Sequence, residues 1–199
     1  MSVDESVVSG SKAAARLRAA AIEAFAANGF GATTTREVAA RLEMSAAAMY
    51  PHYKSKEELL FAIAYEGHQL TLEWLQAADP VGEAPADRLR AVVGEFAKNQ
   101  ATHHARARVV EYELAALTDE HFRVIAGLRR DVVRLVRRIV QAGADDGSFA
   151  VPDVEGVTLA IVSLCVDVCR WFPGGTYTEP DTVAKLYPEL AIRLAGAHS

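Results

Sequence analysis

Apolar residues recur every three or four positions along most of this chain, which is the spacing of one buried face of an α-helix. The first such run consists of Leu17, Ala21, Ile22 and Phe25. It is followed by Asn28 and Gly29, and glycine is the residue that most often follows the last turn of a helix. The pattern therefore predicts a first helix over residues 11–28.

Helix-capping signals divide the next stretch, residues 33–60, into short helices. Thr34 and Glu37 have the spacing of a capping box, in which a hydroxyl and a carboxylate each bond to the other residue's backbone N–H. The helix that starts there covers about two turns and places Val38 and Leu42 on one apolar face.

Two serines mark the starts of the helices that follow. Ser45 is an N-cap candidate for a short helix, which Pro51 ends because proline lacks a backbone donor. Ser55 and Glu58 form a second capping box, in front of a longer helix that we expect to reach about residue 77. This fourth helix leaves the N-terminal group and forms its link to the rest of the chain.

The remaining sequence predicts a second, larger group of helices. Residues 78–87 contain two prolines and a glycine and are typical of a loop. Beyond them no strand-like alternation occurs. Helices are predicted at 86–103, 105–117, 119–144, 153–172 and 180–197. The expected fold class is all-α.

Two short helices joined by a tight turn are typical of a helix-turn-helix, whose second helix lies in the major groove of DNA. The outward side of the second helix, Ala46–Ala48, is small, so the backbone can approach the base edges. Residues nearby suit phosphate, since Tyr50 and His52 donate hydrogen bonds and Lys54 and Lys56 carry positive charge.

Base reading needs other side chains, because alanine neither donates nor accepts a hydrogen bond. It falls to Arg36, to Ser45, or to the backbone and the shape of the DNA. Lys12 and Arg16 are either a minor-groove arm or part of a solvated tail. The candidate DNA-binding residues are Thr34, Thr35, Arg36, Ser45, Ala46, Ala47, Tyr50, His52, Lys54 and Lys56.

At these positions the chain resembles the TetR family of one-component bacterial transcription repressors, over roughly residues 12–66. The matching residues are Thr34, Arg36, Val38, Ala39, Ser45, Met49, Tyr50, His52, Tyr53, Ser55, Lys56, Glu57 and Leu59. Tyr53 stands where phenylalanine is commoner in the family, and Pro51 is a second departure.

Residues 1–10 are polar or small and include Gly10, so we expect a disordered tail there. The resemblance implies two further parts, which are a three-helix helix-turn-helix DNA-binding domain at 11–56 and a ligand-binding and dimerisation domain at 57–199. It also implies a homodimer on a double-stranded operator, with a small-molecule effector held by the larger domain.

Composition and charge narrow the function classes. The chain has 199 residues, is 51% hydrophobic and carries a formal net charge of −5, so we expect modest non-specific DNA affinity that falls steeply with salt. Basic residues flank the predicted contact face, whereas several acidic residues sit in capping positions. No apolar run reaches the roughly 20 residues of a membrane helix, and the acidic start lacks a secretion signal, so we expect a cytoplasmic protein.

Other chemistries are poorly supported. Cys165 and Cys169 lie four apart on one predicted helix and fit buried apolar residues in a reducing compartment better than an oxidant sensor. His103 and His104 point about 100° apart on a helix, so they do not share a metal. Because no glycine-rich phosphate loop, nucleophile elbow or HExxH element occurs, we expect no enzymatic activity, cofactor or metal.

The predicted helix at 153–172 is apolar almost all round, which indicates that it is covered on more than one side. We therefore expect it to pack against a second subunit together with the last helix, as a four-helix interface. The candidate interface residues are Val157, Ile161, Leu164, Val168, Leu186, Leu190 and Leu194. Arginines on the helix at 119–144 are interpreted as a solvated or ion-paired face, not a second nucleic-acid site.

Candidate effector-binding residues combine large apolar groups with polar groups expected near the interior. They are Trp74, Phe96, Asn99, His103, Val110, Glu111, Leu114, Phe122, Asp167, Arg170 and Trp171. Residues 103–117 and 169–183 resemble TetR-type repressors of lipid and steroid catabolism that respond to acyl-CoA thioesters. This resemblance implies a fatty-acyl or related CoA ligand, with Arg170 contacting its phosphates or forming an interface ion pair.

Two alternatives stay open. The chain could be a lipid-binding helical protein of TetR-like shape that does not bind DNA, or an activator that uses the same contacts as a repressor.

Overall fold

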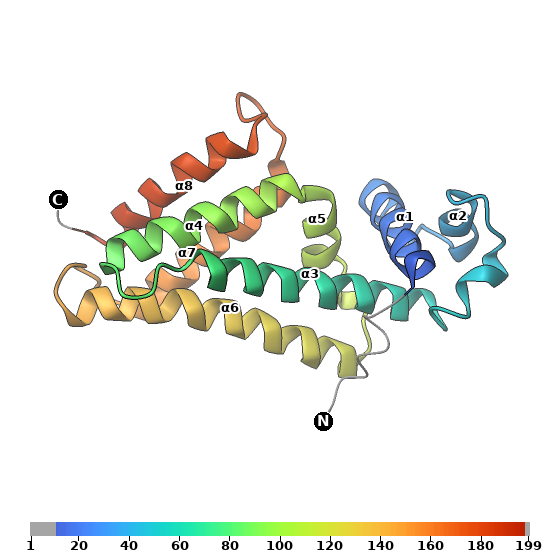
Figure 1. Ribbon diagram of the computed structural model, residues 1–199, viewed down its shortest axis with the longest axis horizontal. Helices are drawn as coiled ribbons and strands as arrows, with labels where there is room; N and C mark the ends of the chain where they lie inside the picture. Colours follow the sequence, from blue (N-terminus) through green and yellow to red (C-terminus); the bar gives the residue numbers. More distant parts are fainter. Residues whose placement is uncertain (1–10, 198–199) are drawn as a thin grey trace. The chain divides into compact units, whose positions relative to one another are not determined.

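The computed structural model describes residues 11–197 (Figure 1). The sequence-based prediction of a disordered tail at residues 1–10 lies outside this range. In chain order the helices are α1 (Lys12–Asn28), α2 (Thr35–Ala40), the 3₁₀ helix η2 (Ala46–Met49), α3 (Lys56–Ala78), α4 (Pro85–Thr102), α5 (His104–Tyr112), the 3₁₀ helix η3 (Leu114–Ala116), α6 (Asp119–Asp145), α7 (Val154–Trp171) and α8 (Pro180–Leu194). Within residues 11–197 the only β-type pairings are isolated bridges, so the all-α prediction is confirmed.

The described residues form two compact units. One comprises residues 11–69 and 105–126, and the other comprises 70–104 and 127–197. The sequence suggested a single boundary at residues 56/57 instead. The difference arises because the apolar side of α5, including Val109 and Val110, is buried in the same core as α1.

The first unit is built around α1 and the first half of α3. Its core contains Leu17, Phe25, Val38, Met49 and Tyr53, together with the α5 valines. Helical spacing in the sequence predicted a buried face for Leu17, Phe25 and Val38. Removing such side chains from water is the main favourable term in folding.

The start of α6 is attached to the start of α3 within the same unit. The Glu57 carboxylate accepts hydrogen bonds from the Thr118 backbone at 2.9 Å and the His121 ring at 2.8 Å. The His121 ring also stacks on Phe61, with ring centroids 3.8 Å apart.

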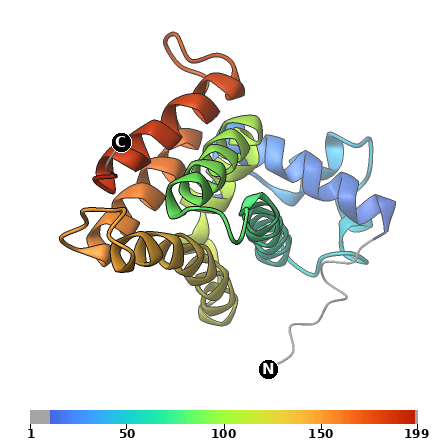
Figure 2. The ribbon, with the colours of Figure 1, turned by 60° about the vertical axis from the view of Figure 1, so that its left-hand side comes forward.

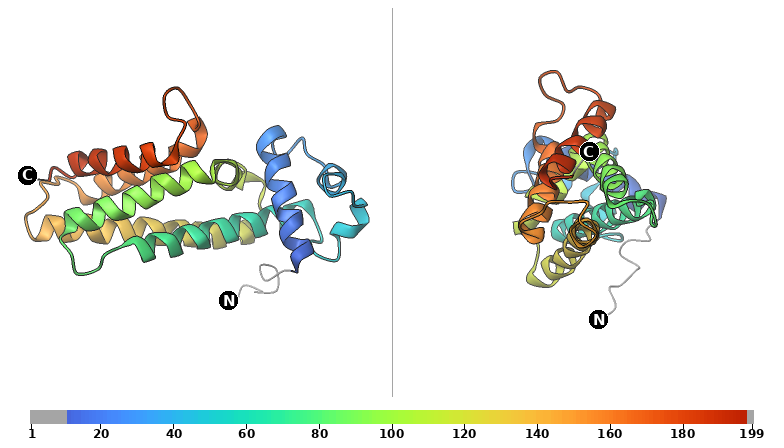
Figure 3. Two further views of the ribbon diagram at one scale, coloured as in Figure 1. Left: turned by 45° about the horizontal axis from the view of Figure 1, so that its top comes forward. Right: turned by 90° about the vertical axis from the view of Figure 1, so that its left-hand side faces the viewer.

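The second unit is a helical bundle in which α4 packs mainly against α8 and also against α7 (Figure 2). Its core includes Leu89, Phe96, Ile139, Ile161 and Val183. Gly94 permits the close approach of α4 and α8, because a Cβ there would lie 3.3 Å from the Ala184 carbonyl oxygen. Figure 3 shows α4 and α8 running alongside each other for most of their length.

Helix ends differ in places from the predicted ones. The helix expected at 105–117 is two pieces, α5 and η3, and the last helix ends at Leu194, before Gly196 with its φ of 60°. No helix among residues 11–197 is long and apolar enough to cross a bilayer.

The prediction that α7 is apolar all round needs correction. Ile161 is only 1% exposed and Val168 is fully buried, and both belong to the core of their own unit. The outward side instead carries Leu159 and Leu164, which are 50% and 39% exposed. Because Ile161 and Val168 are on the side buried within this unit, the four candidate interface residues of α7 cannot all face a second subunit. On α8, Leu186 and Leu190 are half-buried and Leu194 is exposed.

Candidate DNA-binding interface

The turn between α1 and α2 is held by contacts from both sides. Gly29 ends α1 with a φ of 79°, and its N–H donates to the Phe25 carbonyl. The Thr33 hydroxyl donates to the Gly29 carbonyl at 2.8 Å. The Phe30 N–H donates to the Glu113 carboxylate at 3.1 Å. The entry to α2 is therefore constrained before any DNA is bound.

The predicted capping box at the start of α2 is present. The Thr34 N–H donates to Glu37 Oε2 at 2.6 Å, and the Glu37 N–H donates to the Thr34 hydroxyl at 3.2 Å. The hydrogen bonds that the Thr34 N–H and the Thr34 hydroxyl donate to the carboxylate, in that order of importance, lower the pKa of Glu37. The ionised carboxylate is thus the form that the helix start stabilises.

The segment that follows α2 contains a strained residue and only one turn of helix. Glu43 has a φ of 56°, in the left-handed region that non-glycine residues rarely adopt. The predicted recognition helix is the 3₁₀ helix η2, of four residues, and the Ser45 side chain makes no capping hydrogen bond. The tighter winding carries the chain directly into Pro51, where no backbone donor is available to continue a helix.

The predicted DNA-binding residues lie at the surface of this unit to different degrees. Thr34, Arg36, Ser45, Ala47, Tyr50 and Lys54 are exposed. Thr35, Ala46, His52 and Lys56 are half-buried. Tyr50 has a large apolar ring among these residues and is 53% exposed. The exposed hydroxyl, guanidinium and ammonium groups are all of types that bind phosphate oxygens or base edges.

Lys56 has a different role from the one predicted. Its ammonium donates to the carbonyl oxygens of Phe30 and Thr33, each at 2.7 Å, and lies 4.1 Å from the centroid of the Phe30 ring. The expectation of a lysine extended toward phosphate is therefore revised. Lys56 connects the turn before α2 to the start of α3, and Lys54 is the exposed lysine of this segment.

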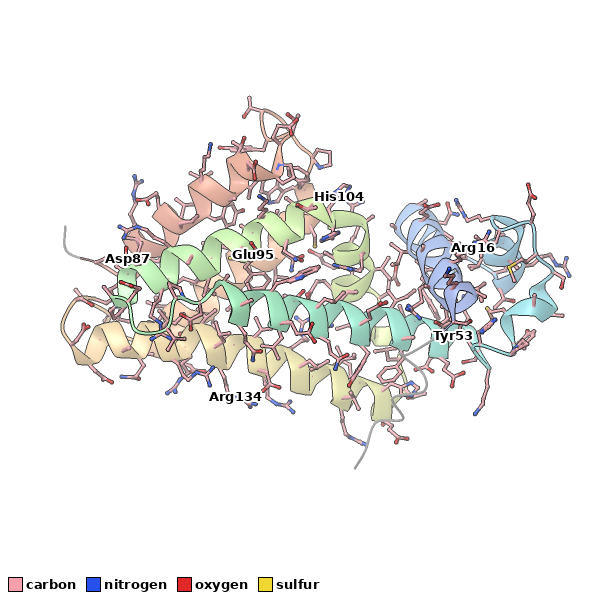
Figure 4. All side chains as sticks on the ribbon, in the orientation of Figure 1. Arg16, Tyr53, Asp87, Glu95, His104 and Arg134 are labelled. Carbon is pink, nitrogen blue, oxygen red and sulfur yellow. The ribbon has the colours of Figure 1, made fainter. Side chains whose placement is uncertain are left out.

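The second predicted capping box forms only in part. The Glu58 N–H donates to the Ser55 hydroxyl at 3.0 Å, but the Glu58 carboxylate accepts from the Lys54 N–H instead of the Ser55 N–H. Lys12 and Arg16 are exposed in the first turns of α1, so neither is in an extended arm. Figure 4 shows Arg16 on α1.

A buried polar cluster near this surface was missed by the sequence reasoning. Arg18 contacts both Tyr53 and Glu66 in the interior of the first unit. The available signal was an arginine directly after Leu17, within the apolar run of α1, and a tyrosine where phenylalanine is commoner. Figure 4 shows Tyr53 between α1 and the beginning of α3.

The predicted effector-binding residues are divided between the two units. Val110 and Leu114 are buried in the first unit, and Glu111 lies 3.9 Å from His68 there. Phe122, also in that unit, is 47% exposed, so its predicted place in an apolar interior is wrong. It lies outside because the buried side of α6 at this end is formed by Ile125.

The remaining predicted effector residues belong to the second unit. Phe96 and Asn99 are buried, and the half-buried Trp74 stacks on His103 with ring centroids 5.4 Å apart. Arg170 is largely exposed and donates to Asp167 at 2.6 and 2.7 Å, so neither is the interior polar group that was expected. Trp171 is half-buried and packs edge-on against Tyr177.

Gln100 was not predicted and is a candidate polar contact in the second unit. It is 4% exposed, and its Oε1 has no hydrogen-bond partner among the residues that the structure describes. By helical spacing it shares a side of α4 with Phe96. At the start of α5, His104 packs against Phe172. An orphaned buried acceptor is costly unless a donor reaches it.

Comparison with protein-family profiles finds two matches. The profile described as "Bacterial regulatory proteins, tetR family" matches residues 17–63. The profile described as "Tetracyclin repressor-like, C-terminal domain" matches residues 82–195.

Individual proteins extend this similarity to nearly the whole chain. The crystal structure of a bacterial regulatory protein in the tetR family from Rhodococcus RHA1 is 52% identical, with a TM-score of 0.92 over 96% of this chain and 100% of that one. The HTH-type transcriptional repressor KstR2 from Mycolicibacterium smegmatis is 29% identical over 180 residues, which are 86% of this chain and 84% of the relative.

A third relative shows the same fold at lower identity. The crystal structure of AibR in complex with isovaleryl coenzyme A and operator DNA has a TM-score of 0.80 and 21% identity, over 92% of this chain and 100% of that chain.

Proposed function

The chain belongs to the TetR family of bacterial regulatory proteins, and on this basis we propose that it is a cytoplasmic repressor that binds an inverted-repeat operator as a homodimer. An effector of the acyl-CoA class releases it from the DNA. It is not expected to be an enzyme, because the relatives are transcriptional regulators.

The observation that carries the DNA-binding part is the set of exposed groups around η2. Arg36, Ser45, Tyr50 and Lys54 project from a segment whose buried side is fully packed. A preorganised surface loses little conformational entropy on binding. Two such surfaces in a dimer would read half-sites about 34–36 Å apart.

The homodimer is supported by the apolar outward residues of α7 and α8. Leu159, Leu164 and Leu194 are exposed large apolar side chains on these two helices. Large apolar groups that gather on one surface often mark an interaction site. We propose that this revised set, with Leu186 and Leu190, replaces the interface residues first predicted.

The effector class is supported by relatives and by Gln100. AibR was crystallised with isovaleryl coenzyme A, and KstR2 is described as a ketosteroid transcriptional regulator. In this chain Gln100 Oε1 would accept a hydrogen bond from an amide N–H or a hydroxyl, and the pantetheine arm of coenzyme A carries both. Phe96, Trp74 and Phe172 would supply apolar contact.

DNA binding is tested with a fluorescently labelled fragment from upstream of the protein's own gene. Lys54→Ala should weaken binding about tenfold on all sequences that bind, because a charge-assisted hydrogen bond to phosphate is lost, and should reduce the salt slope by about one per contact. Lys185→Ala, the same change on α8, is the control and should bind like the wild type. Equal effects of both variants would contradict the assignment of the interface.

Effector release is tested on the same complex with acyl-CoA thioesters of increasing chain length, free fatty acids and free coenzyme A. Gln100→Leu should leave DNA affinity unchanged and raise the thioester concentration needed for release about tenfold. Release by free fatty acids but not by acyl-CoA thioesters would contradict the proposal that the effector is an acyl-CoA. A protein that binds acyl-CoA but no DNA would support the lipid-binding alternative, and a transcription assay separates repressor from activator.

A further inference from the structure

The interior of the first unit contains a buried arginine with three hydrogen bonds. Arg18 is 7% exposed, and its guanidinium donates to the two carboxylate oxygens of Glu66 at 2.8 and 3.3 Å. Its Nη1 donates to the Tyr53 hydroxyl at 2.7 Å. That hydroxyl donates onward to the Ala14 carbonyl at 3.4 Å. The cluster thus joins α1, α3 and the segment between η2 and α3.

The protonation states that these hydrogen bonds require are favoured. Burial raises the pKa of Tyr53, so the phenol keeps its proton at neutral pH. For Arg18, burial alone would lower the pKa, but the hydrogen bond that it donates to Tyr53 and the charge of Glu66 outweigh burial and raise it. Arg18 therefore remains a donor and Tyr53 can both accept and donate.

Tyr53 is the anchor of the segment that carries the candidate DNA contacts. Among residues 50–58 it is the one buried side chain, at 1% exposed, and its neighbours on both sides include Tyr50, His52 and Lys54. The N–H groups of His52 and Tyr53 both donate to the Met49 carbonyl. The position of the Tyr53 ring therefore constrains the backbone that carries Tyr50, His52 and Lys54.

The hydroxyl of Tyr53 is not needed to fill the core. Phenylalanine has the same ring and would occupy nearly the same volume, so packing alone does not explain the hydroxyl. The hydrogen-bond partners of the hydroxyl explain it. The hydroxyl accepts a hydrogen bond from Arg18, and Arg18 is itself fixed by the paired hydrogen bonds to Glu66. Paired bonds of this kind restrict orientation as well as distance.

Glu66 is also under the influence of a second arginine. Arg106 on α5 is largely buried, which lowers its pKa, and the negative charge of Glu66 partly opposes that effect. A Cβ on Gly67 would lie 3.0 Å from Val110 Cγ2, so α3 and α5 are in close contact at this level. Arg18 and Arg106 thus approach one carboxylate from two helices of the same unit.

We propose that Arg18, Tyr53 and Glu66 are positioning residues for DNA binding. The cluster fixes the segment that follows η2 in the orientation that its phosphate-binding groups require, without touching DNA itself. The effect on DNA affinity rests on the proposed function, whereas the effect on amide hydrogen exchange does not depend on DNA.

The test is Tyr53→Phe in the full-length protein. At a temperature where it is fully folded, its DNA affinity should fall about tenfold with an unchanged salt slope, because no phosphate contact is removed. Tyr187→Phe is the matched control, since Tyr187 is also a buried tyrosine and its hydroxyl accepts a hydrogen bond from Trp171 in the second unit. It should leave DNA affinity unchanged. A reduced salt slope for Tyr53→Phe would contradict a role through position.

A double-mutant cycle separates positioning from loss of stability. If Tyr53 acts through Arg18, Tyr53→Phe should have no further effect on DNA affinity in an Arg18→Met background. An effect of equal size in both backgrounds would overturn the proposal, as would wild-type affinity in the folded Tyr53→Phe variant.

Amide hydrogen exchange supplies the readout without DNA. In the Tyr53→Phe variant the backbone amides of residues 52 and 53 should exchange about tenfold faster than in the wild type, while those of α4 and α8 are unchanged. Unchanged exchange in residues 45–55, or a uniform rise throughout the chain, would reject the positioning role. If the wild type binds no promoter DNA but the local exchange increases, the proposed function fails and the structural part of this inference stands.

Discussion

Three charged or polar residues of the first unit hold its backbone at one turn. Lys56, Glu113 and Thr33 all bond to backbone groups of the turn before α2. Each of these contacts satisfies a polar group that would be costly to leave unpaired near the interior. The remaining exposed groups, such as Lys54 and Arg36, are the ones left for a ligand.

The stability of the folded protein at low pH depends in part on Glu37. Its pKa is lower in the folded protein than in the unfolded chain, so its stabilisation is present above the ordinary pKa of about 4.3 and is lost as pH falls through the lower folded value. Glu37→Gln should therefore be less stable than the wild type near pH 7. The difference should shrink below pH 4.

Urea unfolding at several pH values measures this effect. Glu23→Gln is the control, because Glu23 is exposed on α1 and its carboxylate lies 3.7 Å from the Arg41 guanidinium. A Glu37→Gln defect of the same size at every pH would show that the carboxylate charge is not what the capping box uses.

Two glycines on α6 differ in the space that the structure leaves for a side chain. A Cβ on Gly143 would lie 2.2 Å from Phe149 Cδ2, inside the ring's contact distance. At Gly127 the nearest atom within reach is Arg130 Nη2, at 3.9 Å, which can move aside. The first glycine is needed for packing, whereas the second only weakens the helix.

Alanine at these two positions should therefore have opposite effects. Gly143→Ala should lower the free energy of unfolding by about 1–3 kcal/mol, because the Phe149 ring must be displaced. Gly127→Ala should raise it by up to about 1 kcal/mol through helix propensity. Thermal and urea unfolding measure both. Stabilisation by Gly143→Ala would mean that Phe149 moves away without cost.

At the scale of the whole molecule, DNA affinity should depend on assembly, because each protomer presents one set of contacts. The outward leucines of α7 and α8 are the surface that we propose for the two-fold interface. Near a two-fold axis a residue lies close to its own copy, so a single substitution introduces two like charges.

Leu164→Arg should therefore convert a dimer to a monomer and reduce operator affinity together with it. Burying an unpaired charge in an apolar interface is strongly unfavourable. Val81→Arg is the matched control, since Val81 is 79% exposed in the loop before α4. Sedimentation velocity measures both. A Leu164→Arg variant that stays dimeric would place the interface elsewhere.

Local signals in the sequence were sufficient for the all-α fold, the capping box of Thr34 and Glu37, and the exposed side of the DNA-binding segment. Each depends on residues a few positions apart, since helical periodicity and capping are short-range properties of the chain. The family resemblance added the expectation of a DNA-binding part followed by a ligand-binding part. The partners of Arg18, the attachment of Lys56 to Phe30 and the burial of Ile161 and Val168 were decided only by the tertiary structure. They join residues distant in sequence or depend on which side of a helix its neighbours cover, and periodicity does not specify either.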